Sequence, residues 1–598
     1  MFLRCTQRVK DGKLHRYWSI VENRRNAQKK VVQRQVLYLG EINDTQKAAW
    51  VRSIEVLETG SEQWRQVALF PEDRAAPELA HQVVHVCLDR IRIQHPRQWG
   101  GCWIACELWE QLQLDQFWGT RLPASREGTD WLAVLKVLVS YRLLDPGSEW
   151  RLHRQWYGHS AIGELVGHGE AEVALQALYR CLDKLLSHKV ALFSFLTERW
   201  RDLFQAGYDV LLYDLTSTYF ECDPPEDGKR RHGYSRDKRP DCVQVVIALV
   251  VTPAGLPIAY EVLAGNTSEK TTLKSFLQKI EQQYGKVNRT WVMDRGIPTE
   301  EALQEMRTAE VPVSYLVGTP RGRLSKLEKE FLQQPWRHVK EAVEVKLLPR
   351  EGELYILARS QGRQEKERAM RQRRLKRLWQ RLHELQRQKL SRDELLLKLG
   401  AAKADAGQAY RLVEVRLPPA KSAPEAESFS FTFALRKNKL RAARRHEGHY
   451  LLRSNLSAEA PAVLWERYIL LTEIEAVFRN LKTDLILRPI FHQTDARMEA
   501  HIFVAFLAYC LYVTLQQRTR ALAPGLTSRA VLEKMSAIQM VDVCLPTTDG
   551  RLLILPRYTQ PEPDQQLLLQ RLHLVLPPQP APRISQKASS MPLGDDPL

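Results

Sequence analysis

The hydrophobic and polar positions between 467 and 485 repeat with the period of an α-helix. At about 100° per residue, four apolar residues fall within one narrow sector, which predicts a helix with one buried face: Leu470, Ile474, Leu481 and Leu485. On the flank of that face Glu475 lies in line with Tyr468 and Lys482, because seven residues make about two turns. Glu473 points almost the opposite way. An amphipathic helix with a solvated, ion-paired face explains the same pattern.

Apolar runs of strand length predict a mixed α/β core between 208 and 318. A buried strand, 208–214, ends at Asp214, and a short strand, 289–294, ends at Asp294. The other predicted elements are strands 243–251, 256–263 and 313–318 and helices 268–284 and 298–308. This order is compatible with a ribonuclease-H-like sheet but is not unique to it.

The chain of 598 residues is too long for a single hydrophobic core, and its segments differ in character. We expect six parts: an N-terminal β-rich unit and linker at 1–75, a helical, DNA-binding domain at 76–205, the first part of the α/β core at 206–320, a mainly β insertion with a basic helix at 321–455, the second part of the core at 456–525, and a C-terminal extension at 526–598. The end of that extension, 577–598, is rich in Pro, Ser and Ala, which predicts disorder.

A formal net charge of +18 favours a polyanionic partner, nucleic acid before membrane. Within 97–205, basic and aromatic residues interleave from Arg151 to Tyr157, a pattern that fits DNA binding and a plain helical bundle equally well. For the arginine-rich helix 363–399 we favour a DNA-facing role over a merely solvated face.

Targeting and metal signals are weak in this sequence. No stretch resembles a secretory signal or a membrane span, and nine scattered cysteines suit a reducing cytoplasm. The one close pair, Cys102 and Cys106, has no second pair at ligand spacing, so we assign it to a helix face and not to zinc.

Three acidic residues have a reason to be held in place: Asp214 and Asp294 at strand ends, and Glu475 beside a buried helix face. If folding brings them together, they form an oxygen-rich site of the kind that Mg²⁺ prefers. Two bound ions can activate an attacking oxygen and stabilise the leaving oxygen of a phosphodiester. Each aspartate taken alone is more simply a strand-end cap.

Several segments together resemble insertion-sequence transposases of the DDE class, in the branch with a Tyr-x2-Arg-x3-Glu-x6-Lys signature. Tyr468, Leu471, Glu475 and Lys482 stand at that spacing. The resemblance extends over about 30–515 and rests on QVLYLGEI, YRLLDPGSEW, YDLTSTYFE, GYSRDKRPD, GLPIAYEVLAGNTSE, VMDRG and FRNLKTDLILRPIFH.

The resemblance implies a ribonuclease-H-like core in which Asp214, Asp294 and Glu475 bind Mg²⁺, with Mn²⁺ as a substitute, and catalyse DNA cleavage and strand transfer. It also implies that Tyr468 and Lys482 contact phosphates near the scissile bond, and Arg479, about 40° away on the helix, can assist. The implied partners are double-stranded DNA, as terminal inverted repeats and target, and a second copy of the chain in a dimer. The implied location is the bacterial cytoplasm, at the nucleoid and not at a membrane.

One departure from the signature matters: Leu471 stands where the family has arginine. Leucine cannot grip a phosphate as a guanidinium does. The sequence therefore leaves three hypotheses open: an active DDE transposase, a catalytically decayed or repurposed DNA-binding protein with the same fold, and an ordinary nuclease without preference for inverted repeats.

Overall fold

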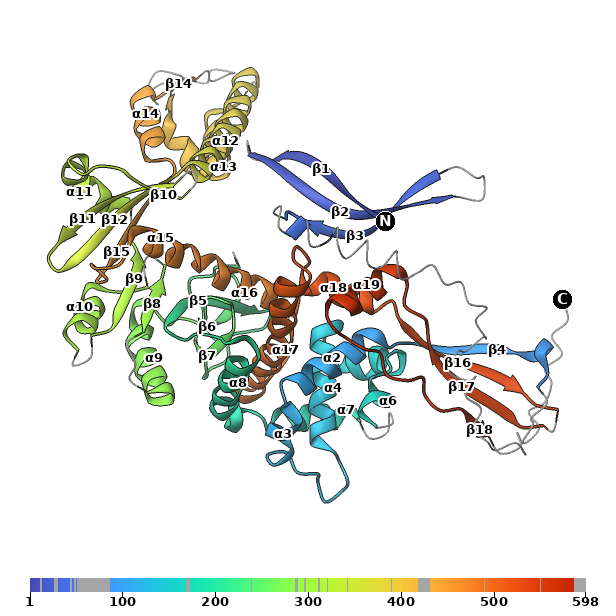
Figure 1. The fold of residues 1–598 in the computed structure, drawn as a ribbon. Helices are drawn as coiled ribbons and strands as arrows, with labels where there is room; N and C mark the ends of the chain where they lie inside the picture. Colours follow the sequence, from blue (N-terminus) through green and yellow to red (C-terminus); the bar gives the residue numbers. More distant parts are fainter. Residues whose placement is uncertain are drawn as a thin grey trace. The chain divides into compact units, whose positions relative to one another are not determined.

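A computed structural model gives the fold of the protein (Figure 1). It describes residues 1–10, 13–25, 31–42, 46–47, 50, 86–167, 173–237, 239–285, 289–294, 297–309, 312–319, 321–340, 343–388, 390–417, 431–488, 490–548 and 550–585. The chain divides into two compact units. Unit 1 comprises Met1–Thr6, Tyr17–Arg289 and Leu470–Leu598, and unit 2 comprises Gln7–Arg16 and Thr290–Ile469.

The chain begins with a three-stranded sheet of order β1-β2-β3, formed by Phe2–Lys10, Lys13–Arg25 and Val31–Gly40. β2 and β3 are antiparallel, and several of their apolar residues are buried, among them Ile20 and Leu37. This sheet falls within the segment predicted to be β-rich, whose status as a separate domain stays a prediction. Most of the predicted helix and linker at 43–75 lies outside the described residues.

Unit 1 contains many helices besides two that are described further below. They are α2 Gly100–Gln111, α3 Leu114–Gly119, α4 Trp131–Leu144, α5 Glu149–Arg151, η3 Leu152–Trp156, η4 Tyr157–His159, α6 Ile162–Val166, α7 Leu175–Leu182, η5 Leu186–His188, α8 Lys189–Phe204, α9 Glu269–Tyr284, α18 Ser528–Met535 and α19 Pro563–Arg571. The long helix α17, Asp495–Leu522, packs against α2, α4 and α7. It is apolar enough to cross a membrane, but 94% of its most apolar window is buried, so it is a core helix.

Besides the N-terminal strands, unit 1 holds two antiparallel β arrangements. The strands β5 Val210–Phe220, β6 Val243–Val251 and β7 Pro257–Ala264 lie in that order. The other has the order β18-β17-β16-β4, formed by Arg583–Ser585, Leu552–Tyr558, Gln539–Pro546 and Arg92–Gln98. A 3-10 turn, η2 Leu88–Arg90, precedes β4. β4 was not expected, because its exposed, mostly polar residues pair with a strand more than 400 positions away.

Unit 2 is built on a mixed sheet of order β10-β11-β12-β15-β9-β8. Its strands are β8 Thr290–Met293, β9 Ser314–Gly318, β10 Arg337–Lys340, β11 Val343–Arg350, β12 Glu353–Ser360 and β15 His449–Ser454. β8 and β9 are parallel, whereas the other pairs are antiparallel. Helices α10 Glu300–Thr308, α11 Arg321–Leu332 and α15 Pro461–Ile469 accompany this sheet.

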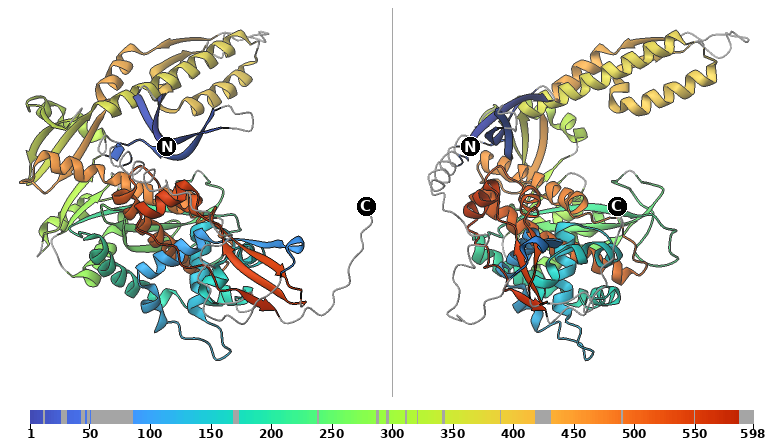
Figure 2. Two further views of the ribbon diagram at one scale, coloured as in Figure 1. Left: turned by 45° about the vertical axis from the view of Figure 1, so that its right-hand side comes forward. Right: turned by 90° about the vertical axis from the view of Figure 1, so that its right-hand side faces the viewer.

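Between β12 and β15 the chain forms a helical arm. It contains α12 Gln361–Arg387, α13 Arg392–Ala406, η6 Gly407–Leu412, β13 Val413–Arg416, β14 Thr432–Leu435 and α14 Lys437–His446. α12 and α13 lie side by side and antiparallel (Figure 2). Their leucines and alanines form a separate hydrophobic cluster that includes Leu382 and Leu395. The insertion is therefore more helical than a mainly β domain.

The helix predicted over 467–485 is divided in the structure. α15 ends at Ile469, and α16 runs from Leu471 to Thr483 after a turn at Leu470. The two helices also belong to different units, α15 to unit 2 and α16 to unit 1. A helical wheel assumes one straight axis, so the predicted line from Tyr468 through Glu475 to Lys482 does not hold across the turn.

Candidate active site

Asp214 lies inside a strand and not at its end. β5 continues for six residues beyond it, to Phe220, and Asp214 pairs in register with Leu249 of β6. The continuation was missed because the segment after Asp214 is rich in Ser and Thr, although Thr216, Ser217 and Thr218 are buried there. Asp214 itself is half-buried, and its Oδ1 accepts a hydrogen bond from the backbone N–H of Leu215 at 2.7 Å. The strand therefore fixes this carboxylate firmly while leaving part of it accessible.

Asp294 follows directly on β8, as the sequence predicts. The four residues of β8 are buried, whereas Asp294 is exposed. β8 belongs to unit 2, whereas Asp214 and Glu475 belong to unit 1. The prediction that all three acids form one site is therefore kept as a proposal.

Glu475 is held on the outer face of α16. The opposite side of this helix is buried through Ile474, Val477 and Leu481, and α16 packs against both β5 and α17. Glu475 is exposed and makes no hydrogen bond or ion pair with any described residue. Because α16 rests on the strand that carries Asp214, both carboxylates belong to one packed part of unit 1.

Glu473 has a different role on the same helix. Its Oε2 lies 2.6 Å from Arg520 Nη2 at the end of α17, and its side chain is 29% exposed. The sequence predicts that Glu473 lies on the side of the helix opposite Glu475, and the structure shows that its partner is Arg520. Glu473 therefore ties α16 to α17, which leaves Glu475 as the available carboxylate of the pair.

Lys482 is part of a compact ion-pair network. Its Nζ lies 3.0 Å from Asp237 Oδ1, and Arg488 Nη1 lies 2.6 Å from Asp237 Oδ2. The guanidinium of Arg488 also stacks over the ring of Tyr219, 5.0 Å from its centroid, near the end of β5. Burial lowers the pKa of Lys482, and Asp237 opposes that change. One carboxylate thus holds two cations beside the strand of Asp214.

Asp237 and Arg488 are site residues that the sequence pattern did not predict. Asp237 stands in the GYSRDKRPD segment, and Arg488 follows α16 in LILRPIF. The one available signal was a lone acid among basic residues in a loop. That signal does not indicate which residue Asp237 contacts, because Asp237 and Lys482 are 245 positions apart.

The remaining predicted residues differ in accessibility. Arg479 is exposed on α16 and makes no side-chain hydrogen bond or ion pair with a described residue. Tyr468 is half-buried on α15 in unit 2, with its ring 6.0 Å from that of Tyr450 and 6.4 Å from that of Trp465. Leu471 is only 8% exposed, so its side chain packs inside unit 1.

A second polar cluster in unit 1 lies away from the predicted acids. One ligand atom from each of Glu149, His492 and His501 falls within 4.8 Å of the others. Arg142 Nη2 is 3.5 Å from His501 Nδ1, and this guanidinium is buried. Arg142 already supplies the positive charge that offsets Glu149, so the cluster is better explained as a buried ion-pair network than as a metal centre.

The pKa values in this cluster follow from burial and hydrogen bonding. Burial opposes ionisation of Glu149, but hydrogen bonds from His492 and His501 outweigh it and hold the pKa of Glu149 well below its usual value. Burial, together with Arg142, lowers the pKa of His501 to about 4. The ionised carboxylate of Glu149, at the start of α5, therefore links His492, which follows α16, to His501 on α17.

Comparison with known proteins gave two family matches and several structural neighbours. The family described as "Transposase DDE domain" matches residues 205–511, and the N-terminal domain of IS1634 family transposases matches residues 3–63. A search among curated proteins found no significant match. The piggyBac transposase, solved by cryo-EM as a synaptic complex with hairpin DNA, aligns over 72% of this chain and 76% of its own. The TM-score of 0.32 and the identity of 9% are too low to define the fold.

Proposed function

Because the chain belongs to the DDE transposases of insertion sequences, we propose that it cleaves DNA at the ends of its own element and joins the freed 3′-hydroxyl groups to target DNA. Asp214, Asp294 and Glu475 are the proposed catalytic carboxylates, in a ribonuclease-H-like core. The proposed substrate is double-stranded DNA that carries the element's terminal inverted repeats. The proposed working form is a homodimer on paired ends.

The contrast between Glu473 and Glu475 carries the proposal. Two carboxylates of equal chemistry stand two positions apart on α16, and only Glu473 is engaged in an ion pair, with Arg520. An unpaired carboxylate in a chain of net charge +18 is available to bind a metal ion. The packing of α16 on β5 further supports a shared site with Asp214.

Transposases with a DDE domain use divalent metal ions. The donor set fits Mg²⁺, with Mn²⁺ as a substitute, because all three side chains offer carboxylate oxygens, and Asp294 and Glu475 are exposed. Such ions, when bound, activate the attacking oxygen and stabilise the leaving oxygen of the phosphodiester. Lys482, Arg479 and Tyr468 are proposed to bind phosphates near the scissile bond, where their positive charges and hydroxyl position the strand.

The alternative function is that of a decayed or repurposed DNA-binding protein. The reason to consider it is that Leu471 stands in place of the signature arginine. The burial of Leu471 weakens this reason. A leucine at the start of α16 packs into the interior of unit 1, so the change has a structural benefit of its own. None of the three proposed catalytic carboxylates is lost with it.

The test uses full-length protein and two duplexes of equal length, one containing the DNA that borders the coding region and one of shuffled sequence. We expect strand cleavage of the bordering DNA only, with Mg²⁺ or Mn²⁺ and not with chelator. Asp214→Asn is expected to bind this duplex and leave it intact. Equal cleavage of both duplexes would indicate an ordinary nuclease, and tight binding without cleavage by the wild type would indicate the decayed protein.

A further inference from the structure

Helix α12 in the arm of unit 2 has one buried and one strongly basic side. Leu378, Leu382 and Leu385 are buried in the cluster shared with α13. Beside this buried face Arg373, Arg377 and Arg381 follow one another at intervals of four residues, which places them about 6 Å apart along the axis. Like charges at this spacing repel one another, so an anion bound along this row would stabilise the helix.

Two hollows run along the flank of α12 and share Arg374. The first, of about 420 Å³, lies between α12, η6 and α14, and the second, of about 530 Å³, lies between α12 and α13. Together we name them the α12 groove. Its basic lining residues are Arg363, Arg371, Arg374, Arg377, Arg381, Arg411 and His446. From Arg363 to Arg381 the groove follows α12 for about 27 Å.

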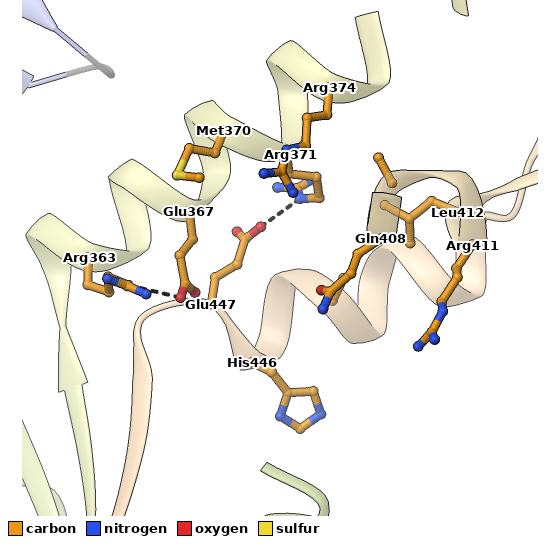
Figure 3. A pocket seen from close by; sticks show the side chains of 12 residues that line it. Arg363, Glu367, Met370, Arg371, Arg374, Gln408, Arg411, Leu412, His446 and Glu447 are labelled. Atoms are coloured by element: carbon orange, nitrogen blue, oxygen red, sulfur yellow. Dashed lines mark hydrogen bonds and ion pairs between the residues drawn. The ribbon is translucent and has the colours of Figure 1, made fainter. Parts of the chain in front are cut away.

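Acidic residues neutralise only part of this lining. Arg363 Nε lies 3.0 Å from Glu367 Oε1, and Arg371 Nε lies 2.6 Å from the buried Glu447 (Figure 3). These two ion pairs hold the side chains of Arg363 and Arg371 in place. Arg381, which lines the second hollow, pairs at 3.0 Å with Glu384, which lines neither.

The remaining basic side chains of the α12 groove are available. The side chains of Arg374, Arg377, Arg411 and His446 make no hydrogen bond or ion pair with any described residue. One further carboxylate, Asp405, lines the second hollow. The groove therefore keeps three unpaired guanidinium groups, those of Arg374, Arg377 and Arg411, between its paired ends.

We propose that the α12 groove binds the sugar-phosphate backbone of DNA. This inference rests on the proposed function, since it adds a second contact to the same substrate. Guanidinium groups bind phosphate oxygens in pairs of hydrogen bonds, and a length of about 27 Å corresponds to about eight nucleotides of one strand. A mononucleotide would fill only one hollow.

The test compares two double variants of the full-length protein with the same loss of charge. R374Q/R377Q removes the two unpaired groove arginines of α12. K376Q/R387Q is the matched control, because both residues are exposed on α12 and line neither hollow. Binding of a 40-base-pair duplex is measured by fluorescence anisotropy at several salt concentrations.

The groove variant is expected to lose about tenfold or more in affinity at 0.1 M salt. Its plot of log K against log salt is expected to be shallower by about 1.8, since each lost phosphate contact removes about 0.9. The control is expected to stay close to the wild type. An unchanged slope in the groove variant, or an equal loss in the control, would overturn the assignment. Metal-dependent cleavage at saturating protein tests the catalytic proposal separately.

Discussion

Lys482 Nζ lies 3.0 Å from Asp237 Oδ1, although the two residues are 245 positions apart in the chain. The same carboxylate also holds Arg488. Lys482 is the last residue of the signature that includes Glu475. Asp237, in the loop after β5, therefore fixes the position of the Lys482 ammonium group. The position of a proposed phosphate-binding group thus depends on an acid outside the catalytic trio.

Asp237→Asn should therefore loosen this end of α16. Lys482 and Arg488 would be left facing each other without their common anion, at a cost of about 1.5–3 kcal/mol in the free energy of unfolding. The shift is measured by chemical denaturation. Asp227→Asn is the control, because Asp227 is exposed in the same loop and pairs with Arg231 only at 3.9 Å, so its change should stay within about 0.5 kcal/mol. Equal shifts in both variants would contradict the structural role of Asp237.

Acid should destabilise the protein through His501. The pKa of this buried imidazole is about 4, below its ordinary value of 6.5, because burial and Arg142 disfavour its charged form. Between pH 6.5 and 4 the unfolded chain takes up a proton that the folded chain does not. Stability therefore falls as the pH falls through this interval.

His501→Gln should reduce that dependence on pH. Denaturation midpoints at pH 7.5, 6.0 and 5.0 measure it, and His159→Gln, at an exposed position, is the control that should keep the wild-type dependence. An equal or steeper fall with acid in His501→Gln than in the wild type would show that other groups govern the response.

Leu471→Arg should destabilise the protein and not restore a lost function. Because Leu471 is 8% exposed, the substitution places an unpaired charge in the interior of unit 1, which costs about 2–4 kcal/mol. Leu471→Met, which keeps the volume, should cost less than about 1.5 kcal/mol. Denaturation of both variants checks this. Faster cleavage by Leu471→Arg at unchanged stability would show that the side chain reaches the DNA.

The sequence pattern predicts elements well where the apolar residues are continuous. Strands β6 and β7 and the helices between α2 and α8 follow from such runs, and Asp294 lies directly after β8 as predicted. The pattern failed where buried residues are polar: Thr216 and Thr218 extend β5 beyond Asp214.

Tertiary relationships were beyond the sequence pattern. The apolar residues keep a helical period across the turn at Leu470. That period carries no information about where the helix axis bends, so the turn could not be predicted. The ion pair between Asp237 and Lys482 depends on how a loop folds back onto α16. Of the candidate site, the residue types could be predicted, but their partners and accessibility could not.

The central claim is that Glu475, and not its neighbour Glu473, acts in catalysis. The most direct measurement is the single-turnover rate of Mg²⁺-dependent cleavage of the element-end duplex by Glu475→Gln and Glu473→Gln, at saturating protein. Both changes remove one negative charge from α16 and keep its length and shape. We predict that Glu475→Gln binds the duplex but lowers the rate by about a thousandfold or more, the cost of losing a group that acts directly on the reacting atoms. Glu473→Gln is predicted to cleave within about threefold of the wild-type rate. Cleavage by Glu475→Gln at the rate of Glu473→Gln would contradict the account.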